Sequence, residues 1–392
     1  MEEFCAPRRL LLGPGPSAVH PRVLQAMATP LVGHLDPTFL GIMNDVQARL
    51  RHLFSTVNRF TIAVSGTGSA GMEAAVVNLV EPGDAVIVGV NGVFGTRLAA
   101  IVERCGGKAI RIEVPWGQII EPNMIEERLR KSGPVKAVAL VHAETSTGAR
   151  QPIEPISAMC RAHDALLIVD AVTSLGGLPV EVDQWGIDVC YSATQKCLSC
   201  PPGLAPLTLN ERAIYAVHRR RVPCQSWYFD LSLIADYWTE HNRAYHHTAP
   251  ISMLYALREA LRIIAEEGVP ARFSRHHLNS RALMAGLKAL GLDPVPPVDY
   301  RLPTLLCVTV PASIDESAVR SQLLERFGIE IGGGLGDLKG KVWRIGLMGE
   351  SSTEANVLTL LNALEEIGIQ SGWVSTPGIA LQAAAYTYSV GR

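Results

Sequence analysis

The chain has 392 residues, of which 48% are hydrophobic and 18% are charged, and its formal net charge is −2. This composition is typical of a well-packed globular protein and excludes a disordered one, and the length suggests one large and one small domain. No basic run long enough to bind nucleic acid occurs, and no apolar run approaches the ~20 residues of a membrane span.

The cysteines and the two ends of the chain bear on its location. Eight cysteines are scattered along the sequence, and two of them, Cys190 and Cys307, lie in apolar segments. We therefore expect reduced thiols in a cytoplasmic protein. Residues 1–9 contain no long apolar stretch, so we expect no secretory signal, and the last residues, 390–392, are not a peroxisomal address.

Strands and helices alternate over most of the chain, after a stiff segment at 10–17 whose alternating glycines and prolines predict neither helix nor strand. From Thr61 to Leu209, apolar runs of strand length alternate with segments of helical periodicity. This alternation predicts a doubly wound, mostly parallel sheet with its polar loops at one edge. The expected strands are 60–64, 85–90, 109–114, 135–141, 165–169 and 187–189, and the expected helices are 21–27, 39–53, 72–80, 97–105, 124–131 and 155–163.

A smaller α/β unit is expected to begin near Arg275, after a helix over 251–267. Its elements are strands 305–310 and 342–345 and a helix over 316–327. Residues after about Ser371 show no clear period, and we expect a loosely packed or disordered tail there. The predicted organisation is an N-terminal segment 1–20, a large domain 21–270, a small domain 271–370 and a tail 371–392.

Two strand ends carry the strongest chemical signal. The apolar strand 165–169 ends at Asp170, and the strand 187–189 leads through Tyr-Ser-Ala-Thr-Gln to Lys196. Open α/β sheets place ligand groups at the carboxyl ends of strands. Taken alone, Lys196 could be a surface lysine and Asp170 a turn residue. Together they provide what pyridoxal phosphate requires: an amine of lowered pKa for a Schiff base and a carboxylate for the pyridine nitrogen.

A glycine-rich turn, Ser-Gly-Thr-Gly-Ser-Ala-Gly at 65–71, precedes the helix that is expected from Met72. Free backbone N–H groups and the helix dipole make such a turn an anion site. Its glycines also fit the G-x-G-x-x-G pattern, so a dinucleotide-binding dehydrogenase is an alternative. The next strand ends at Asn91 without the acidic residue of a dinucleotide site, and the hydroxyls of Thr67 and Ser69 favour a single phosphate.

Other polar or flat side chains also follow predicted strands. Phe94 could stack on a flat ring or pack in the core, and a polar cluster occupies 142–148. Arg344 could clamp a substrate carboxylate or form a structural ion pair. His34 and Asp36 could cap a helix or line the mouth of a site.

Two groups of residues could be read as metal ligands. The adjacent histidines His246 and His247 have poor spacing for one ion, and the pair Cys197 and Cys200 lacks a second Cys-x-x-Cys pair. We therefore expect no metal site.

Several separated motifs together resemble the alanine–glyoxylate aminotransferases, a branch of the class-V, fold-type I pyridoxal phosphate enzymes. The resemblance covers about residues 10–364 and is far more specific than any single motif. The motifs are Leu-Leu-Leu-Gly-Pro-Gly-Pro-Ser at 10–17, Ser-Gly-Thr-Gly at 65–68, Ser-Thr-Gly at 146–148, Val-Asp-Ala-Val-Thr-Ser-Leu-Gly-Gly at 169–177, Ser-Ala-Thr-Gln-Lys at 192–196, Tyr-His-His-Thr at 245–248, Gly-Gly-Leu-Gly at 333–336 and Arg-Ile-Gly-Leu at 344–347.

The resemblance implies a large, doubly wound, mostly parallel sheet domain, a smaller C-terminal α/β domain and a set of site residues. Lys196 would form the Schiff base and carry the proton shift, and Asp170 would pair with the pyridine nitrogen. Arg344 would bind the substrate carboxylate, with the loop that begins at Gly33 as one wall. The implied cofactor contacts are ring packing by Val172 and Phe94, a hydroxyl from Thr145 near the ring, and phosphate binding by Thr67, Gly68, Ser69 and Gln195, joined by Tyr245 and Thr248 from the neighbouring subunit of a homodimer.

The implied reaction is transamination between L-alanine and glyoxylate, which gives pyruvate and glycine by a ping-pong mechanism. Serine or ureidoglycine as the amino donor is the nearest alternative. A pyridoxal phosphate lyase or desulfurase is more distant, because a desulfurase needs a mobile cysteine and Cys307 lies in a predicted strand. A non-catalytic relative is disfavoured by the presence of Lys196, Asp170 and Arg344 together.

Overall fold

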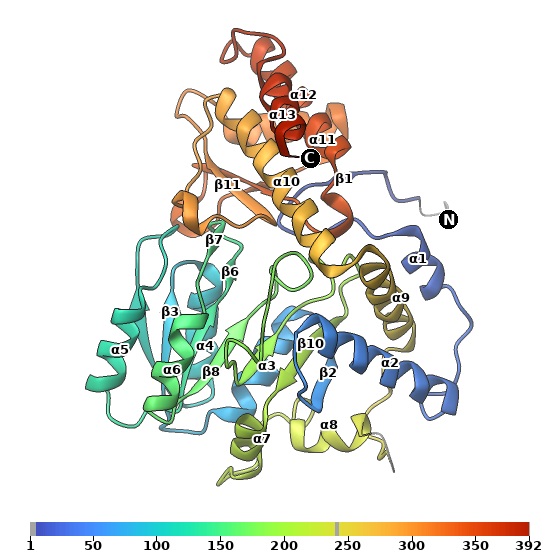
Figure 1. Cartoon of the computed structure of the whole chain (residues 1–392), viewed down its shortest axis with the longest axis vertical. Helices are drawn as coiled ribbons and strands as arrows, with labels where there is room; N and C mark the ends of the chain where they lie inside the picture. Colours follow the sequence, from blue (N-terminus) through green and yellow to red (C-terminus); the bar gives the residue numbers. More distant parts are fainter. Residues whose placement is uncertain (1–4, 240–242, 392) are drawn as a thin grey trace.

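A computed structural model of the chain describes residues 5–239 and 243–391. A larger lower part and a smaller upper part meet near the middle of the molecule, and the helix α10 (Val269–Ala289) runs from the junction into the upper part (Figure 1). Each part has its own hydrophobic core, one built from residues between Val23 and Ile264 and the other from Leu12 and residues between Ala282 and Tyr388. The N-terminal segment therefore contributes to the core of the upper part.

Within the described residues, the lower part contains a seven-stranded sheet of order β2-β10-β9-β8-β5-β3-β4. Strand β10 is antiparallel to both of its neighbours, and the other pairs are parallel. The doubly wound, mostly parallel α/β sheet is confirmed, and the loops that follow its parallel strands gather at one edge. The strands are β2 (Phe60–Ser65), β3 (Ala85–Val90), β4 (Lys108–Glu113), β5 (Ala137–Val141), β8 (Leu166–Asp170), β9 (Val189–Tyr191) and β10 (Leu204–Leu209).

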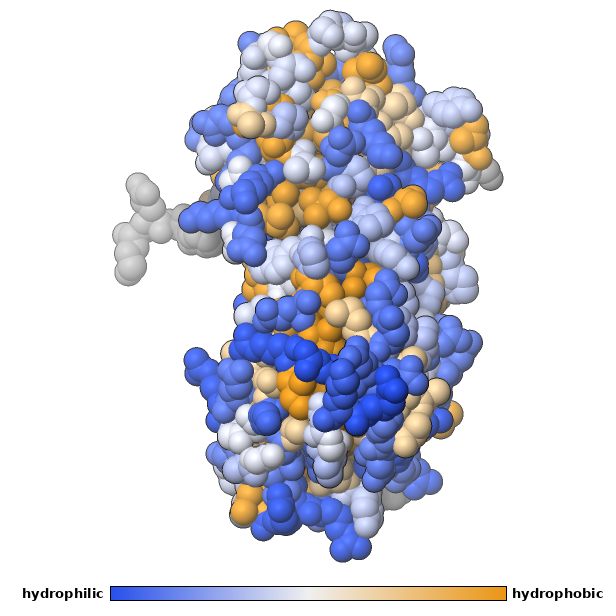
Figure 2. Space-filling model, turned by 90° about the vertical axis from the view of Figure 1, so that its left-hand side faces the viewer, coloured by the Kyte–Doolittle hydropathy of each residue, from blue (hydrophilic) through white to orange (hydrophobic). Residues whose placement is uncertain are grey.

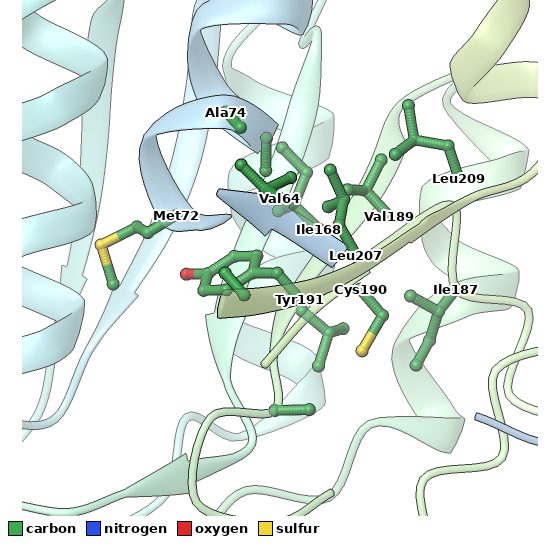
Figure 3. Packing of buried hydrophobic residues seen from close by; sticks show 14 of the residues in the cluster. Val64, Met72, Ala74, Ile168, Ile187, Val189, Cys190, Tyr191, Leu207 and Leu209 are labelled. Carbon is green, nitrogen blue, oxygen red and sulfur yellow. The ribbon is translucent and has the colours of Figure 1, made fainter. Parts of the chain in front are cut away.

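The centre of this sheet is buried on both faces. Figure 3 shows apolar side chains of β2, β8, β9 and β10 packed together, with Met72 and Ala74 of α3 (Gly68–Leu79) beside them. Burial of each large aliphatic side chain contributes about 1.5–3 kcal/mol, so these strands form a rigid base for the loops at their ends.

The predicted helices of the lower part are present, and two of them begin four residues earlier than expected. Helix α3 begins at Gly68 instead of Met72, and α4 begins at Val93 instead of Arg97. A two-stranded hairpin also lies in the polar cluster after β5. The remaining elements are α1 (Pro21–Met27), α2 (Pro37–Leu53), α4 (Val93–Arg104), α5 (Pro122–Lys131), β6 (Ala143–Glu144), β7 (Ala149–Arg150), α6 (Glu154–Ala162), α7 (Glu211–His218), α8 (Leu231–Trp238) and α9 (Ile251–Glu267).

The upper part is a three-stranded antiparallel sheet covered by helices. Its strand order is β11-β14-β13. Three short 3₁₀ turns lie at 298–300, 336–338 and 349–351. The elements are β11 (Leu305–Thr309), α11 (Glu316–Phe327), β12 (Ile329–Glu330), β13 (Gly332–Gly333), β14 (Val342–Gly346), α12 (Glu354–Gln370) and α13 (Ile379–Gly391).

Both ends of the chain differ from the prediction. Strand β1 (Leu10–Leu11) is a short strand in the segment that was expected to be irregular, and it pairs in parallel with β12. The tail that was expected to be loose contains α13, whose residues Ala380, Ala384 and Tyr388 are buried. These three residues are four positions apart and so share one face of a helix, and the Tyr388 hydroxyl donates to Asn279 Oδ1 over 2.8 Å.

The surface is mixed in polarity. Figure 2 shows polar residues that border smaller apolar patches on one side of the molecule. None of the helices in the described part of the chain is both long enough and apolar enough to cross a membrane.

Candidate active site

Lys196 lies on a tight turn directly after β9, at the carboxyl edge of the sheet. The turn is closed by backbone hydrogen bonds, including Ser199 N to Lys196 O at 3.0 Å and Cys200 N to Thr194 O at 3.1 Å. The side-chain amine points toward the N-terminal segment and donates to the Pro14 carbonyl oxygen. Burial lowers the pKa of Lys196 to about 8, and the positive charge of Arg344 acts in the same direction. A larger fraction of this amine is neutral near pH 8 than for an exposed lysine, which suits a nucleophile.

Asp170 is the last residue of β8 and is 2% exposed. Its Oδ1 accepts from Val172 N over 2.9 Å, whereas Oδ2 has no hydrogen-bond partner among the described residues. Burial raises the pKa of Asp170 to about 7. A buried carboxylate oxygen without a partner is costly unless a donor or cation occupies the space beside it.

Tyr191 was not predicted as a site residue, yet it lies next to Asp170. The two residues are register partners on the parallel strands β8 and β9, and the Tyr191 hydroxyl is near enough to help stabilise the Asp170 carboxylate, although it too lacks a well-formed hydrogen bond among the described residues. Tyr191 is fully buried. Sequence alone gave no signal here, because an aromatic residue in a buried strand is typical of a core.

Arg344 and Thr145 meet across the junction of the two parts. Arg344 lies on β14 and is 7% exposed, and its Nη1 donates to the Thr145 carbonyl oxygen over 3.3 Å while its Nε donates to Gly333 O over 2.7 Å. The Thr145 hydroxyl lies 2.8 Å from that of Thr173. The described residues include no carboxylate in ion-pair contact with Arg344, so its charge is available to a bound anion.

The N-terminus of α3 forms a cradle for a small anion. Thr67 is the N-cap residue, and its side chain makes no capping hydrogen bond. At Gly68, an added Cβ would lie 2.8 Å from Ala193 Cβ and 3.3 Å from Val172 Cγ2, so the backbone approaches these residues closely. Gln195 Oε1 is buried without a partner among the described residues. Free helix N–H groups and these side chains suit a phosphate.

A second helix start completes this wall of the site. Phe94, in the first turn of α4, has the guanidinium of Arg97 4.9 Å from its ring centre, and Arg97 also donates to Ser69 Oγ over 3.2 Å. Buried Glu144 accepts from the Phe94 N–H over 3.1 Å and from Gly95 N–H over 3.3 Å. Glu144 belongs to the polar cluster that was noted at 142–148, but neither its role nor that of Arg97 was predicted, because both roles depend on contacts between distant segments.

The remaining predicted residues, Tyr245, Thr248 and Gly33, are exposed. Tyr245 is 59% exposed, and its hydroxyl is 3.4 Å from that of Thr248, which is also exposed. Gly33 is exposed, with no atom within 4 Å of an added Cβ. Among the described residues, no hydrogen bond joins these three to Lys196 or Arg344.

The loop that contains Gly33 nevertheless lies beside Tyr245. The ring centres of His34 and Tyr245 are 5.2 Å apart. Asp36 caps α2 by accepting from Thr38 N over 2.8 Å, which confirms the capping interpretation for that residue. His246 and His247 contact each other, with Nδ1 atoms 2.7 Å apart.

These residues fit pyridoxal phosphate. The unpaired Asp170 Oδ2 can accept from a protonated pyridine nitrogen, Lys196 has an amine of lowered pKa, and the start of α3 can bind the phosphate. Each of these groups is suited to bind or react with one part of that cofactor: the ring nitrogen, the aldehyde or the phosphate.

Comparisons with known proteins agree with this site. The sequence profile of the class-V aminotransferases matches residues 10–339. The (S)-ureidoglycine–glyoxylate transaminase of Bacillus subtilis is 44% identical over 404 residues, which cover 98% of this chain and 97% of that protein. The alanine–glyoxylate aminotransferase of Mus musculus is 41% identical and covers 92% of this chain and 87% of that protein.

A solved structure gives the same result. The alanine–glyoxylate aminotransferase from Nostoc sp. superposes with a TM-score of 0.92 at 50% sequence identity, over 94% of this chain and 97% of that one. The extent of these matches confirms the fold-type I architecture and the predicted pyridoxal phosphate dependence. The chain is therefore a pyridoxal phosphate-dependent transaminase that belongs to the class-V aminotransferase family.

Proposed function

We propose that the protein transfers the amino group of L-alanine to glyoxylate, which yields pyruvate and glycine. The observation that carries this proposal is that three groups meet at one edge of the sheet. They are the Lys196 amine, the unpaired Asp170 Oδ2 and the Arg344 guanidinium, which has no carboxylate partner among the described residues. Relatives that are named for transamination with glyoxylate support the choice of acceptor.

Each residue has a separate task in this reaction. When bound, pyridoxal phosphate supplies an electron sink for the electrons left at the Cα of the amino acid. Lys196 would take the Cα proton on its Nζ and deliver it to the cofactor carbon that is bonded to the amino nitrogen. Its flexible side chain and lowered pKa suit it to this task. Asp170 holds a proton on the pyridine nitrogen, and its burial makes this charge pair strong.

Arg344 sets the orientation of the substrate. Its guanidinium can bind a carboxylate bidentately, and both alanine and glyoxylate carry one. Two backbone carbonyls already fix the guanidinium, through Gly333 O and Thr145 O. Because Thr145 also lies beside Thr173 in the Asp170 loop, the carboxylate clamp is built against the cofactor site.

For the amino donor, a specific alternative to L-alanine exists. The Bacillus subtilis relative is named for ureidoglycine, so (S)-ureidoglycine is the second candidate donor, and serine is a third. The half-buried His34 and the exposed Tyr245 are candidate contacts for a larger donor.

The decisive experiment follows the visible absorption of the purified, cofactor-bound protein. We expect L-alanine to remove the visible band and glyoxylate to restore it, because the two half-reactions interconvert the aldehyde and amine forms of the cofactor. The control donors are L-serine and (S)-ureidoglycine at equal concentration. A band that responds to ureidoglycine or serine and ignores alanine would reassign the donor, and a band that ignores all three would reject the proposed function.

We also propose a homodimer in which Tyr245 and Thr248 of one subunit complete the phosphate site of the other. Their exposure supports this arrangement, as does the lack of a hydrogen bond between either residue and Lys196 among the described residues. Exposed apolar residues of the same region, Leu31 and Leu35, are suited to burial against a partner. Sedimentation should give a mass of twice the 42.3 kDa chain.

We further propose a cytoplasmic location. All eight cysteines are free thiols, and six of them are buried, as expected for a reducing compartment. Fractionation of the native source with an antibody to the protein tests this placement.

A desulfurase activity is not favoured. Cys307 is on β11 and is buried, and burial raises its pKa to about 12. A strand residue with a protonated thiol is unsuited to the role of a mobile nucleophile.

A further inference from the structure

A buried arginine outside the substrate and cofactor contacts connects the loops that carry the reacting groups. Arg272 lies in the first turn of α10 and is 1% exposed. Its Nε donates to Gly176 O over 2.9 Å and its Nη2 donates to Cys197 O over 2.7 Å. Gly176 belongs to the loop that follows Asp170, and Cys197 directly follows Lys196.

The positive charge of Arg272 is paired with a carboxylate that lies outside these two loops. Its Nη1 lies 2.6 Å from Oε2 of Glu267, the last residue of α9. One planar guanidinium thus joins a carboxylate and two carbonyls from three separate segments, which the single ammonium of lysine cannot span.

The next turn of α10 also reaches the segment after the Arg344 strand. His276 Nε2 accepts from Gly349 N over 2.9 Å, and Arg275 donates to Gly349 O over 3.0 Å. Gly349 approaches so closely that an added Cβ would lie 3.1 Å from Arg272 Nη2. The start of α10 therefore contacts the loops after β8, β9 and β14.

We propose that Arg272 is a positioning residue that fixes the Lys196 turn relative to the Asp170 loop, an inference that rests on the proposed function. It acts through Cys197 O, while Ser17 Oγ holds Lys196 O from the other side over 2.6 Å. Removal of the guanidinium fork frees the turn, and the amine loses its fixed distance to Asp170.

The charges that face Lys196 show how such a shift can be read. Asp170, Arg344 and the Cys197 thiol all influence its pKa. Because Arg272→Lys keeps the positive charge, a change of the Lys196 titration in that variant would report a change of position and not the loss of a neighbouring charge.

The test compares Arg272→Lys with Arg275→Lys, both as cofactor-bound protein. Both variants keep the charge beside Glu267, and Arg275 touches neither the Lys196 turn nor the Asp170 loop. For Arg272→Lys we expect the pH midpoint of the visible band to move by about half a unit or more. We also expect kcat per bound cofactor to fall about tenfold, with KM for the amino donor changed less than about twofold.

A merely structural role gives a different result. If both variants lose thermal stability and neither changes the midpoint or kcat per bound cofactor, the positioning role is wrong. If Arg272→Lys does not fold, Arg272→Gln decides: its shorter side chain cannot span both carbonyls, and an unmoved midpoint there overturns the proposal. The midpoint needs no substrate, so it is informative even if the wild-type protein transfers no amino group and the proposed function fails.

Discussion

Burial acts in opposite directions on the two central titratable groups of the site. It lowers the pKa of Lys196 to about 8 and raises the pKa of Asp170 to about 7. In both cases the low-dielectric surroundings favour the neutral form. A cation beside Asp170 would reverse the effect there, which is why this carboxyl is well suited to hold a protonated ring nitrogen.

The raised pKa of Asp170 predicts a pH-dependent stability of the cofactor-free protein. Between about pH 4 and pH 7 the folded carboxyl keeps a proton that the unfolded chain releases, so the free energy of unfolding falls as pH rises through this window. Asp170→Asn removes this dependence. The stability of the variant relative to wild type should therefore increase by on the order of 2 kcal/mol from pH 4 to pH 7.

Denaturant unfolding of both cofactor-free proteins at several pH values measures this difference. Asp293→Asn replaces an exposed aspartate, where no cost of burial acts, and is the matched control. A difference between Asp170→Asn and wild type that stays constant from pH 4 to pH 7 would contradict the prediction.

Lys196 makes a prediction about covalent attachment. Borohydride reduction of the cofactor-bound protein should fix the cofactor mass to the peptide that contains Lys196, and Lys196→Ala should show no such mass and at least about a thousandfold lower kcat. Mass spectrometry of digested protein reads this outcome. Lys288→Ala, at an exposed lysine on α10, is the control and should keep both the cofactor attachment and the wild-type kcat. Cofactor attachment that persists in Lys196→Ala would exclude Lys196 as the residue that binds the cofactor covalently.

At the level of elements, Glu144 determines where α4 begins. It accepts from two N–H groups in the first turn, and Ser146 Oγ donates to it over 2.5 Å. Gly92 packs directly against both side chains, so there is no room for a Cβ. We expect Gly92→Ala to lower the free energy of unfolding by about 1–3 kcal/mol through overpacking, and to weaken cofactor binding because Phe94 moves with the helix.

Gly41→Ala is the matched control for this substitution. Gly41 is an exposed residue in α2 with no atom within 4 Å of an added Cβ, so alanine there should be stabilising by about 0.5–1 kcal/mol. Thermal unfolding with and without pyridoxal phosphate measures both variants. Equal stability of the two would show that the space around Gly92 adapts.

Periodicity located most elements but missed what tertiary contacts decide. The helices over 251–267 and 316–327 were predicted with their observed bounds, because their apolar stripes are regular. The early starts at Gly68 and Val93 were missed because glycine-rich turns have low helix propensity, and at the start of α4 the distant Glu144 accepts from the free N–H groups. Helix α13 was missed because its buried face consists mainly of small residues.

The same limit applies to the site. Lys196, Asp170 and Arg344 could be proposed from strand ends and family motifs, since each lies where the chain leaves a strand or in a strand of its own. Arg272 and Tyr191 could not, because an arginine in a helix and a tyrosine in a buried strand have no local signal. Their importance comes only from the distant residues beside them.

At the level of the whole molecule, the proposed dimer makes each site depend on two chains. Lys196→Ala removes one half of a site and Tyr245→Ala the other, so each variant alone should be nearly inactive. After mixing, unfolding and refolding together, half of the dimers are hybrids with one intact site, which predicts recovery of about one quarter of wild-type activity.

Activity assays of the mixture, with each variant refolded alone as the control, test the shared site. Hybrid dimers can be isolated through a tag on one variant, which shows that exchange has taken place. Hybrids without activity would place Tyr245 in the same site as the Lys196 of its own chain, and full activity of Tyr245→Ala refolded alone would place Tyr245 outside the site.

The pairing of β1 with β12 has a consequence for the order in which the protein is made. Arg9 and Leu324, which bond beside this pair, are 315 positions apart, and the carbonyl that receives the Lys196 amine, that of Pro14, belongs to the same leading segment. During synthesis β1 must therefore stay unpaired until β12 has been made. The segment that carries Pro14, the partner of the Lys196 amine, is therefore anchored through β1 only after β12 has formed.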